Sequence, residues 1–523
     1  MELIWMIIIL MAGGLLAWFT ARHSELLSRV ISLTAVFIGF LLTLYIWITK
    51  ASNLDFTATE WLTEVSMQWI PRFGISFHLA MDGLSLVLVM LTMFLGLVSV
   101  AVSWKEIQHR PGFFHFNILW VLAGITGVFL AMDLFLFYFF WEVMLIPMYF
   151  IIGIWGHEDR TRAAYKFFIF TQAGGLLMFV AILTLYMLNG DITGSYTFDY
   201  LKFSDTFLYS TQAKWIMAGF LAAFLVKLPA VPLHNWLPDA HTQAPTAGSV
   251  ILAGLLLKTG AYGLYRFVIP AFPSASEAFA PVAMIIGVVG ILYGAKLAFA
   301  QTDLKRMIAY TSISHMGFVL LAVFSFNELA LKGGIMQMLT HGISTGALFV
   351  IAGIIQERLH TRDIREMGGF WETAPWMGGI TMVFILASLG LPGMGNFIAE
   401  FLILLGTFET FTVYAIIAAL ALIASPIYGL YLMQRVFHGP KPENLHLKDF
   451  NPRELAIGFT MVVIIIWMGL YPRTFLNTTE QSVKNIHYRI EKAEMQPSDN
   501  QKQYSFQLDD ILYESSEITL PDK

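Results

Sequence analysis

Apolar runs long enough to cross a lipid bilayer fill most of this chain. A helix needs about 20 residues to span the hydrocarbon core, and 14 apolar runs follow one another with short polar connections. No segment shows the regular alternation of a membrane β-barrel strand. The sequence therefore predicts an all-α membrane protein with 14 transmembrane helices. The runs are Leu3–Thr20, Val30–Thr49, Leu84–Ser103, Phe113–Met132, Leu134–Trp155, Phe167–Leu188, Trp215–Val226, Pro245–Tyr265, Ala278–Ala295, Met307–Phe326, Gly333–Gln356, Ala374–Phe408, Thr410–Gln434 and Leu455–Pro472.

The composition supports a membrane protein and excludes several kinds of site. Of the 523 residues, 57% are hydrophobic and 13% are charged, whereas soluble domains carry about 25% charged residues. The chain has no cysteine, which excludes a cysteine-ligated iron–sulfur cluster, a zinc–thiolate site and a redox disulfide within it. It has no P-loop, no glycine-rich dinucleotide motif and no basic stripe for nucleic acid. Redox chemistry linked to this protein is therefore expected in another chain.

Lysine and arginine are distributed unevenly between the two sets of connecting loops. One set carries sixteen of these residues and the other set carries six. Because basic residues are retained on the cytoplasmic side, the richer set is expected there, with both termini on the periplasmic side. The sixteen are Arg22, Arg29, Lys105, Arg110, Arg160, Arg162, Lys166, Lys305, Arg306, Arg358, Arg362, Arg365, Arg435, Lys441, Lys448 and Arg453.

Two of the apolar runs contain or end in helix-breaking motifs beside a charged residue. The seventh run leads into Lys227-Leu-Pro-Ala-Val-Pro232, and the twelfth contains Gly390-Leu-Pro-Gly-Met-Gly395. Proline removes a helical hydrogen bond, so the freed carbonyl groups need protein or water as partners. Such breaks at matching points of two halves are typical of transporters with internal repeats. A simple kink is the alternative for each.

Four charged side chains lie where an ionised group is energetically unfavourable. Glu142, Lys227 and Lys258 lie within or at the end of apolar runs, and Glu400 follows the uncharged stretch Thr373–Ala399. An ionised group at the centre of a membrane costs roughly 2.5–3.5 kcal/mol on insertion scales, so such groups usually mark an ion or proton path. Because burial disfavours the charged form, each of them can exchange a proton.

Each of these four side chains also has a purely structural interpretation. Glu142 and Lys227 can form a static ion pair that fixes the register of two helices. Lys258 can extend its ammonium group to the membrane interface. Glu400 can hydrogen-bond to the broken backbone of its own helix. The coincidence of charge with a helix break at two of these positions favours transport.

Three histidines, His234, His315 and His341, lie in or beside the same apolar runs. An imidazole ring can accept a proton on one nitrogen and donate from the other, which suits a relay near neutral pH. A hydrogen-bonded structural role is the alternative for each histidine. Haem ligation by a pair of them is a further alternative.

Five motifs are long and specific: Phe140–Tyr149 (FWEVMLIPMY), Lys227–His241 (KLPAVPLHNWLPDAH), Gln243–Ser249, Leu255–Lys258 and Asp303–Gly317. They resemble the antiporter-like, proton-pumping membrane subunits of respiratory complex I, the NADH:quinone oxidoreductase. The resemblance covers residues 1 to about 475. The segment Gly390–Glu400 looks like that of the M-type subunit (chain 4 in mitochondrial naming), because the L- and N-type subunits usually have lysine where this chain has Glu400.

The resemblance implies a fold with two inverted five-helix repeats. Helices 4–8 would form one repeat and helices 9–13 the other, with helices 7 and 12 discontinuous. The implied segments are 1–112 for helices 1–3, 113–270 and 271–440 for the two repeats, 441–475 for helix 14, and 476–523 for a polar C-terminal tail.

The resemblance also implies a proton relay. Glu142 and Lys227 would form a gating ion pair, Lys258 would be the central carrier and Glu400 the terminal carrier. Three histidines would connect these groups through water: His234, His315 and His341.

The implied partners are other membrane-arm subunits of complex I, namely the L-type and N-type neighbours and the lateral helix of the L-type subunit, together with the lipid bilayer. Flavin, iron–sulfur clusters and quinone are expected in partner subunits, and no cofactor or metal is expected in this chain. We therefore expect a proton-translocating subunit in the inner (plasma) membrane of a bacterium. A cation/proton antiporter subunit without redox partners, or a purely structural membrane-arm spacer, is the alternative.

Overall fold

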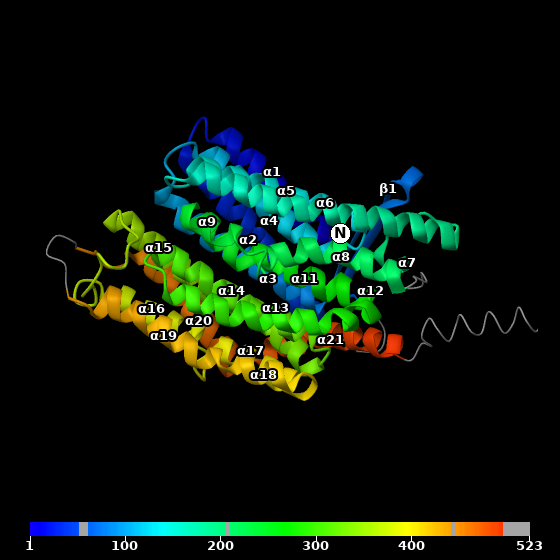
Figure 1. Cartoon of the computed structure of the whole chain (residues 1–523). Helices are drawn as coiled ribbons and strands as arrows, with labels where there is room; N and C mark the ends of the chain where they lie inside the picture. The colour runs from blue at the N-terminus through cyan, green and yellow to red at the C-terminus, as the bar shows by residue number, and fades with distance from the viewer. Residues whose placement is uncertain (52–60, 204–209, 441–445, 495–523) are drawn as a thin grey trace, which may run out of the picture.

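In the described part of the chain, twelve helices are long and apolar enough to cross a membrane, and they lie side by side in one bundle (Figure 1). The computed structural model describes residues 1–51, 61–203, 210–440 and 446–494. The multi-pass helical membrane protein predicted from the sequence is confirmed. The twelve are α1 (Glu2–Thr20), α2 (Glu25–Lys50), α3 (Gly83–Glu106), α4 (Pro111–Leu130), α5 (Leu134–Trp155), α6 (Arg160–Thr193), the continuous helix Thr246–Ala271, α13 (Pro273–Phe299), α14 (Leu304–Phe324), α15 (Glu328–Leu359), the continuous helix Thr412–His438, and α20 (Pro452–Leu470).

Two of these continuous helices contain irregular turns. In Thr246–Ala271 the regular segments are separated by π-helical turns, where each residue bonds to the carbonyl five positions earlier. Thr412–His438 also ends in a π-helical turn. The segments are α10 (Thr246–Ile251), η3 (Leu252–Leu256), α11 (Leu257–Gly263), η4 (Leu264–Val268) and α12 (Ile269–Ala271), and then α18 (Thr412–Ala419), α19 (Ala421–Met433) and η5 (Gln434–His438).

Shorter helices lie at both of the helix-breaking motifs. Helix α8 (Ser210–Lys227) ends at its lysine, and α9 (Trp236–Gln243) begins after a non-helical stretch. Helix α16 (Pro375–Ser388) is separated from α17 (Gly395–Thr410) by a turn in which Gly390 has φ +71°. Only glycine adopts this left-handed backbone without strain, so the turn ends the helix at this point.

The connecting loops gather at the two ends of the bundle. At one end, the Arg29 side chain of α2 donates a hydrogen bond to the carbonyl of Ile107, 3.3 Å away, after α3. At the other end, Lys50 pairs with Glu2 over 3.2 Å. The N-terminus therefore lies near the end of α2, in the same region as β1 and α21 (Figure 1).

A C-terminal helix, α21 (Arg473–Glu494), occupies part of the region that the sequence analysis assigned to a polar tail. It packs against α3 and α15. The contact with α3 is close, because a Cβ atom on Gly83 would lie 1.8 Å from the carbonyl oxygen of Thr478. The Ser482 hydroxyl accepts a hydrogen bond from the amide of Leu84 over 3.1 Å. The rest of the tail lies outside the described residues.

A two-stranded antiparallel hairpin, which the sequence analysis did not predict, precedes α3. Strand β1 (Thr63–Ile70) pairs with β2 (Ile75–Met81) through the 3-10 turn Pro71–Phe73. The short helix α7 (Tyr200–Phe203) lies nearby, because its preceding residue Asp199 forms an isolated bridge with Asp133.

The hairpin is anchored by His78, a buried side chain of β2 that is 3% exposed. Its Nε2 atom lies 2.7 Å from Glu64 of β1, and its Nδ1 atom lies 3.5 Å from Asp199. Burial lowers the pKa of His78, but hydrogen bonds and charge attraction from Asp199 and Glu64 outweigh it, so the pKa is raised above its ordinary 6.5. The imidazolium therefore holds the hairpin to the loop before α7.

This arrangement predicts a pH dependence. A raised pKa in the folded state stabilises the hairpin fully below pH 6.5, and the stabilisation is lost as the pH rises through the raised value. We expect hydrogen exchange of the hairpin amides, corrected for intrinsic rates, to accelerate over that range. His78→Gln should remove this dependence, and His360→Gln, an exposed histidine elsewhere, should retain it. An unchanged pH profile in His78→Gln would contradict the role of the imidazolium.

Candidate functional site

Six of the seven site residues predicted from the sequence are almost completely buried. Burial here is within the chain itself, so these side chains do not face lipid. Glu142 is the exception, because it is only partly buried. The exposed fractions are 0% for Lys227, 3% for His234, 0% for Lys258, 2% for His315, 0% for His341 and 4% for Glu400.

Four of these residues form a continuous row across α11, α15, α14 and α17. The Nζ atom of Lys258 lies 2.6 Å from Nδ1 of His341. The rings of His341 and His315 are 5.4 Å apart between centroids, in an edge-to-face arrangement. The Nε2 atom of His315 lies 3.8 Å from Oε1 of Glu400. The structure thus brings together a lysine, two histidines and a carboxylate from four helices.

Lys258 is positioned by the irregular backbone of its own helix. The π-helical turn Leu252–Leu256 lies one turn earlier, and the carbonyl of Ala253 accepts a hydrogen bond from Lys258 Nζ over 2.6 Å. An ammonium group has donors only, so a charged Lys258 requires the Nδ1 atom of His341 to be unprotonated. The proton of a neutral His341 is then on Nε2, and this atom has no hydrogen-bond partner among the described residues.

Glu400 lies against the break between α16 and α17. Its Oε1 atom accepts a hydrogen bond from Gln337 over 3.4 Å. Its Oε2 atom would lie 3.0 Å from a Cβ atom on Gly390, so the absence of a side chain at this position makes room for the carboxylate. The carbonyl of Ser388, at the end of α16, lies 3.2 Å from His315 Nε2. The break therefore supplies both space and a free acceptor to the row.

Glu142 and Lys227 are not in contact in this structure. Within the part of the chain that the structure describes, no ion pair of 4.0 Å or less joins them, and the Lys227 ammonium has no hydrogen bond. The ammonium instead lies 5.3 Å from the ring centroids of both Trp141 and Phe167. Glu142 accepts a hydrogen bond from Gln172 over 3.4 Å. The expected ion pair is therefore not formed in this structure, and the ammonium lies over two aromatic rings instead.

A tryptophan side chain bridges the non-helical stretch between α8 and α9. The Nε1 atom of Trp236, at the start of α9, donates a hydrogen bond to the carbonyl of Val226 over 2.8 Å. This carbonyl belongs to the last turn of α8, where no helical partner is available. His234 lies between the two helices, with its ring 5.3 Å from the ring of Tyr293. Neither of its ring nitrogens has a hydrogen-bond partner among the described residues.

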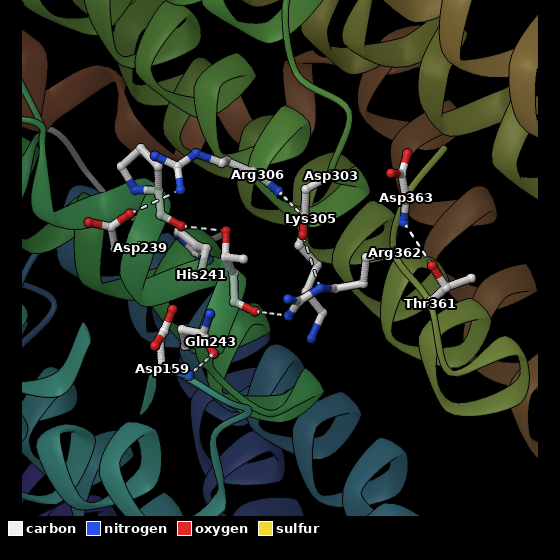
Figure 2. Close-up of polar contacts among 12 residues, drawn as sticks. Asp159, Asp239, His241, Gln243, Asp303, Lys305, Arg306, Thr361, Arg362 and Asp363 are labelled. Carbon is white, nitrogen blue, oxygen red and sulfur yellow. Dashed lines mark hydrogen bonds and ion pairs between the residues drawn. The ribbon is translucent and has the colours of Figure 1, made fainter. Parts of the chain in front are cut away.

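Ion pairs hold α9 between α6 and α14. Asp239 of α9 pairs with Lys166 of α6 over 2.6 Å. It also pairs with Arg306 of α14 over 3.1 Å (Figure 2). Arg362 pairs with Asp303, the residue that caps α14, over 3.0 Å. The segment after the break is thus fixed to α6 and α14.

The buried His241 and Lys305 and the partly buried Glu106 lie near α9, and the sequence analysis did not predict them as site residues. His241 and Lys305 are both 0% exposed. Lys305 donates a hydrogen bond to the carbonyl of Ala244 over 3.1 Å, and Glu106 accepts from both the amide and the hydroxyl of Thr246, each over 2.9 Å. His241 is the last residue of the motif Lys227–His241, and this motif is the signal that could have identified it.

A cavity of about 820 Å³ opens at this end of the bundle. Glu106, His157, Asp303 and Arg362 are among the residues that line it. Burial and the nearby charges of Lys305 and Arg362 lower the pKa of His157 to about 3, so this histidine is neutral at physiological pH. In the described part of the chain, no group of three or more His, Asp or Glu side chains could hold a metal ion.

The fold and the buried row define a class of protein, a multi-pass helical membrane protein of the antiporter-like kind. Residues 131–425 match the family described as NADH:quinone oxidoreductase/Mrp antiporter, transmembrane. The chain belongs to this family of membrane subunits.

Curated relatives match nearly the whole chain. NADH-quinone oxidoreductase subunit M of Pseudomonas aeruginosa is 50% identical over 496 residues, which cover 93% of this chain and 97% of that protein. The subunit M of Escherichia coli K12 is 48% identical with the same coverage. NADH-ubiquinone oxidoreductase chain 4 of Arabidopsis thaliana is 40% identical, with 91% and 94% covered.

Two solved structures share the fold. A chain of respiratory complex I from Thermus thermophilus with bound NADH matches with a TM-score of 0.85 and 29% identity, covering 94% of this chain and 100% of that chain. A chain of the Mrp complex from Dietzia sp. matches with a TM-score of 0.80 and covers 93% of this chain and 97% of that chain. Its identity of 19% shows a common fold alone.

The hydrogen bond from Trp236 to the Val226 carbonyl is expected to stabilise the folded protein. Trp236→Phe should lower the free energy of unfolding by about 1–3 kcal/mol, because it leaves the buried Val226 carbonyl unpaired. Trp215→Phe is the matched control, since Trp215 is 76% exposed on α8. Denaturant unfolding of the protein in detergent micelles measures both. Equal stability of the two variants would show that the bond contributes nothing.

Proposed function

We propose that this chain is the M-type, proton-translocating membrane-arm subunit of a bacterial NADH:quinone oxidoreductase. The family match, and relatives near 50% identity that carry the name subunit M, support this proposal. The observation that carries it is the buried row from Lys258 to Glu400, in which four groups able to exchange protons follow one another inside the bundle. A proton path is the usual reason for such groups inside a membrane.

The row supports a stepwise proton transfer. Lys258 can give a proton to Nδ1 of His341 over their 2.6 Å contact, and the ring can release its other proton from Nε2. His315 receives that proton, directly or through water, and passes one on to Glu400, whose carboxylate lies 3.8 Å away. Each imidazole is then neutral again, with its proton on the other ring nitrogen.

Lys227 and Glu142 are proposed as the gate of this relay. When Lys227 lies beside Glu142, its charge is compensated; when the two are apart, as here, the uncompensated ammonium repels positive charge on Lys258. A proton on Lys258 is thereby favoured to move along the row towards Glu400. His234, with its unpartnered ring between α8 and α9, is proposed as the link between Lys227 and the rest of the relay.

The energy for transport must arrive from neighbouring subunits. Moving one charge against the membrane potential costs about 2.3 kcal/mol per 100 mV, and this chain has no cysteine and no nucleotide motif. We assign flavin, iron–sulfur clusters and quinone to partner subunits. The proposed neighbours are the L-type and N-type subunits and the lateral helix of the L-type subunit.

We also propose how the chain lies in the membrane. The pairs α8–α9 and α16–α17 each complete one crossing, which gives 14 in all. Residues 113–270 and 271–440 form the two inverted repeats, and the basic loops face the cytoplasm with both termini in the periplasm of the inner membrane.

A cation/proton antiporter subunit without redox partners is the second candidate, since the same row could serve exchange. The relatives at 48–50% identity favour the oxidoreductase, because the likeness to the Mrp structure rests on 19% identity. Co-purification with flavin- and iron–sulfur-containing chains would select the oxidoreductase. Sodium-driven exchange by the isolated protein would select the antiporter.

The relay predicts the effect of removing single charges. Glu142→Gln or Lys258→Met should reduce NADH-driven proton pumping at least about tenfold in inverted membrane vesicles, because each interrupts the path, while the complex still assembles. Lys296→Met is the matched control, since Lys296 is an exposed cation on α13. It should pump like the unmodified complex. Normal pumping by both relay variants would favour a structural spacer and reject the relay.

A further inference from the structure

The Lys227 ammonium lies in an unusual environment for a buried cation. It is 0% exposed and has no hydrogen bond among the described residues. The faces of Trp141 and Phe167 are its neighbours, each with its ring centroid 5.3 Å away. A cation within about 6 Å of an aromatic ring is attracted by the negative charge of the ring face, most strongly by tryptophan.

The two rings are held rigidly in place. Trp141 packs edge-to-face against Phe224, with centroids 5.7 Å apart, and also contacts Phe137 over 5.8 Å. Phe167 packs against Trp236 over 5.4 Å. Since both rings are completely buried, they offer a fixed surface and the flexible lysine side chain is the part that can move.

The carboxylate partner lies next to this surface. Glu142 follows Trp141 on α5, and both side chains approach the same small residue of α6. A Cβ atom on Gly175 would lie 3.3 Å from Oε1 of Glu142 and 3.5 Å from Nε1 of Trp141. The lysine therefore has two neighbouring sites for its charge, a carboxylate and a pair of rings.

We propose that Trp141 and Phe167 form an aromatic seat that holds the Lys227 ammonium in the open state of the gate. The seat attracts the cation but cannot accept its proton, because a ring face has no basic atom. Lys227 thus keeps its proton while it is away from Glu142, so that its positive charge remains to repel positive charge on Lys258. Both aromatic residues are positioning residues, and this role rests on the proposed function of Lys227.

Fluorinated tryptophans at position 141 test the seat without changing the shape of the ring. Each fluorine withdraws charge from the ring face and weakens its attraction for a cation. Site-specific incorporation of mono-, di-, tri- and tetrafluorotryptophan in the assembled complex should lower NADH-driven pumping in vesicles stepwise, by about tenfold over the series. The same series at the exposed Trp215 should have no effect. A role in packing alone predicts a flat series at both positions.

A second pair of variants separates a ring over the ammonium from a buried ring elsewhere. Phe167→Leu removes one face of the seat and should lower pumping severalfold. Phe114→Leu removes a completely buried ring of α4 that packs against Trp155 and has no cation contact among the described residues, so it should pump nearly normally. Equal pumping by the two variants would overturn the seat.

Lys227→Leu distinguishes the seat from the function on which it rests. If this variant pumps normally, Lys227 is not part of the relay and the proposed function fails at this residue. If it does not pump and the fluorination series is flat, the seat alone is rejected. If it does not pump and the series declines stepwise, both stand.

Discussion

The close contact between Lys258 and His341 is the interaction on which the buried row depends. A buried lysine keeps its charge only where neighbouring groups compensate it, and at Lys258 these groups are hydrogen-bond acceptors. The structure supplies two acceptors, an imidazole nitrogen and a carbonyl, each 2.6 Å from the ammonium. The imidazole nitrogen can also take up a proton, whereas the carbonyl only accepts a hydrogen bond. Stability and proton exchange are therefore served by the same contacts.

Irregular backbone supplies the polar atoms that an apolar bundle lacks. A regular helix satisfies its own carbonyl groups and leaves none for a buried side chain. Here the π-helical turn presents the carbonyl of Ala253 to Lys258, and the end of α16 presents that of Ser388 to His315. The two glycine- and proline-rich breaks and the π-helical turns all lie next to charged or imidazole groups, which are groups that can pair with carbonyls freed from helical hydrogen bonds.

The sequence was sufficient to predict a multi-pass helical membrane protein and most of its buried charged groups, because an apolar run makes a single charge conspicuous. It could not show which groups meet, since His341 and Lys258 are 83 positions apart, nor that Lys227 lies among rings and away from Glu142. Helix α21 was missed because its polar residues outweigh its apolar ones, although the buried Val483, Ile486 and Ile490 have helical spacing. Lys305 was counted as a loop residue because only packing reveals that it is buried.

The π-helical turns have a consequence for the register of their helix. Each residue of a regular helix rotates the chain by about 100°, and a π-helical turn accommodates one residue more than a regular turn. Removing one residue between Leu252 and Leu256 would straighten that turn and rotate everything on one side of it relative to the other. Lys258 would then aim at a different neighbour from His341. The π-helical turn thus sets the rotation of the residues that follow it, and with it the direction in which the Lys258 side chain points.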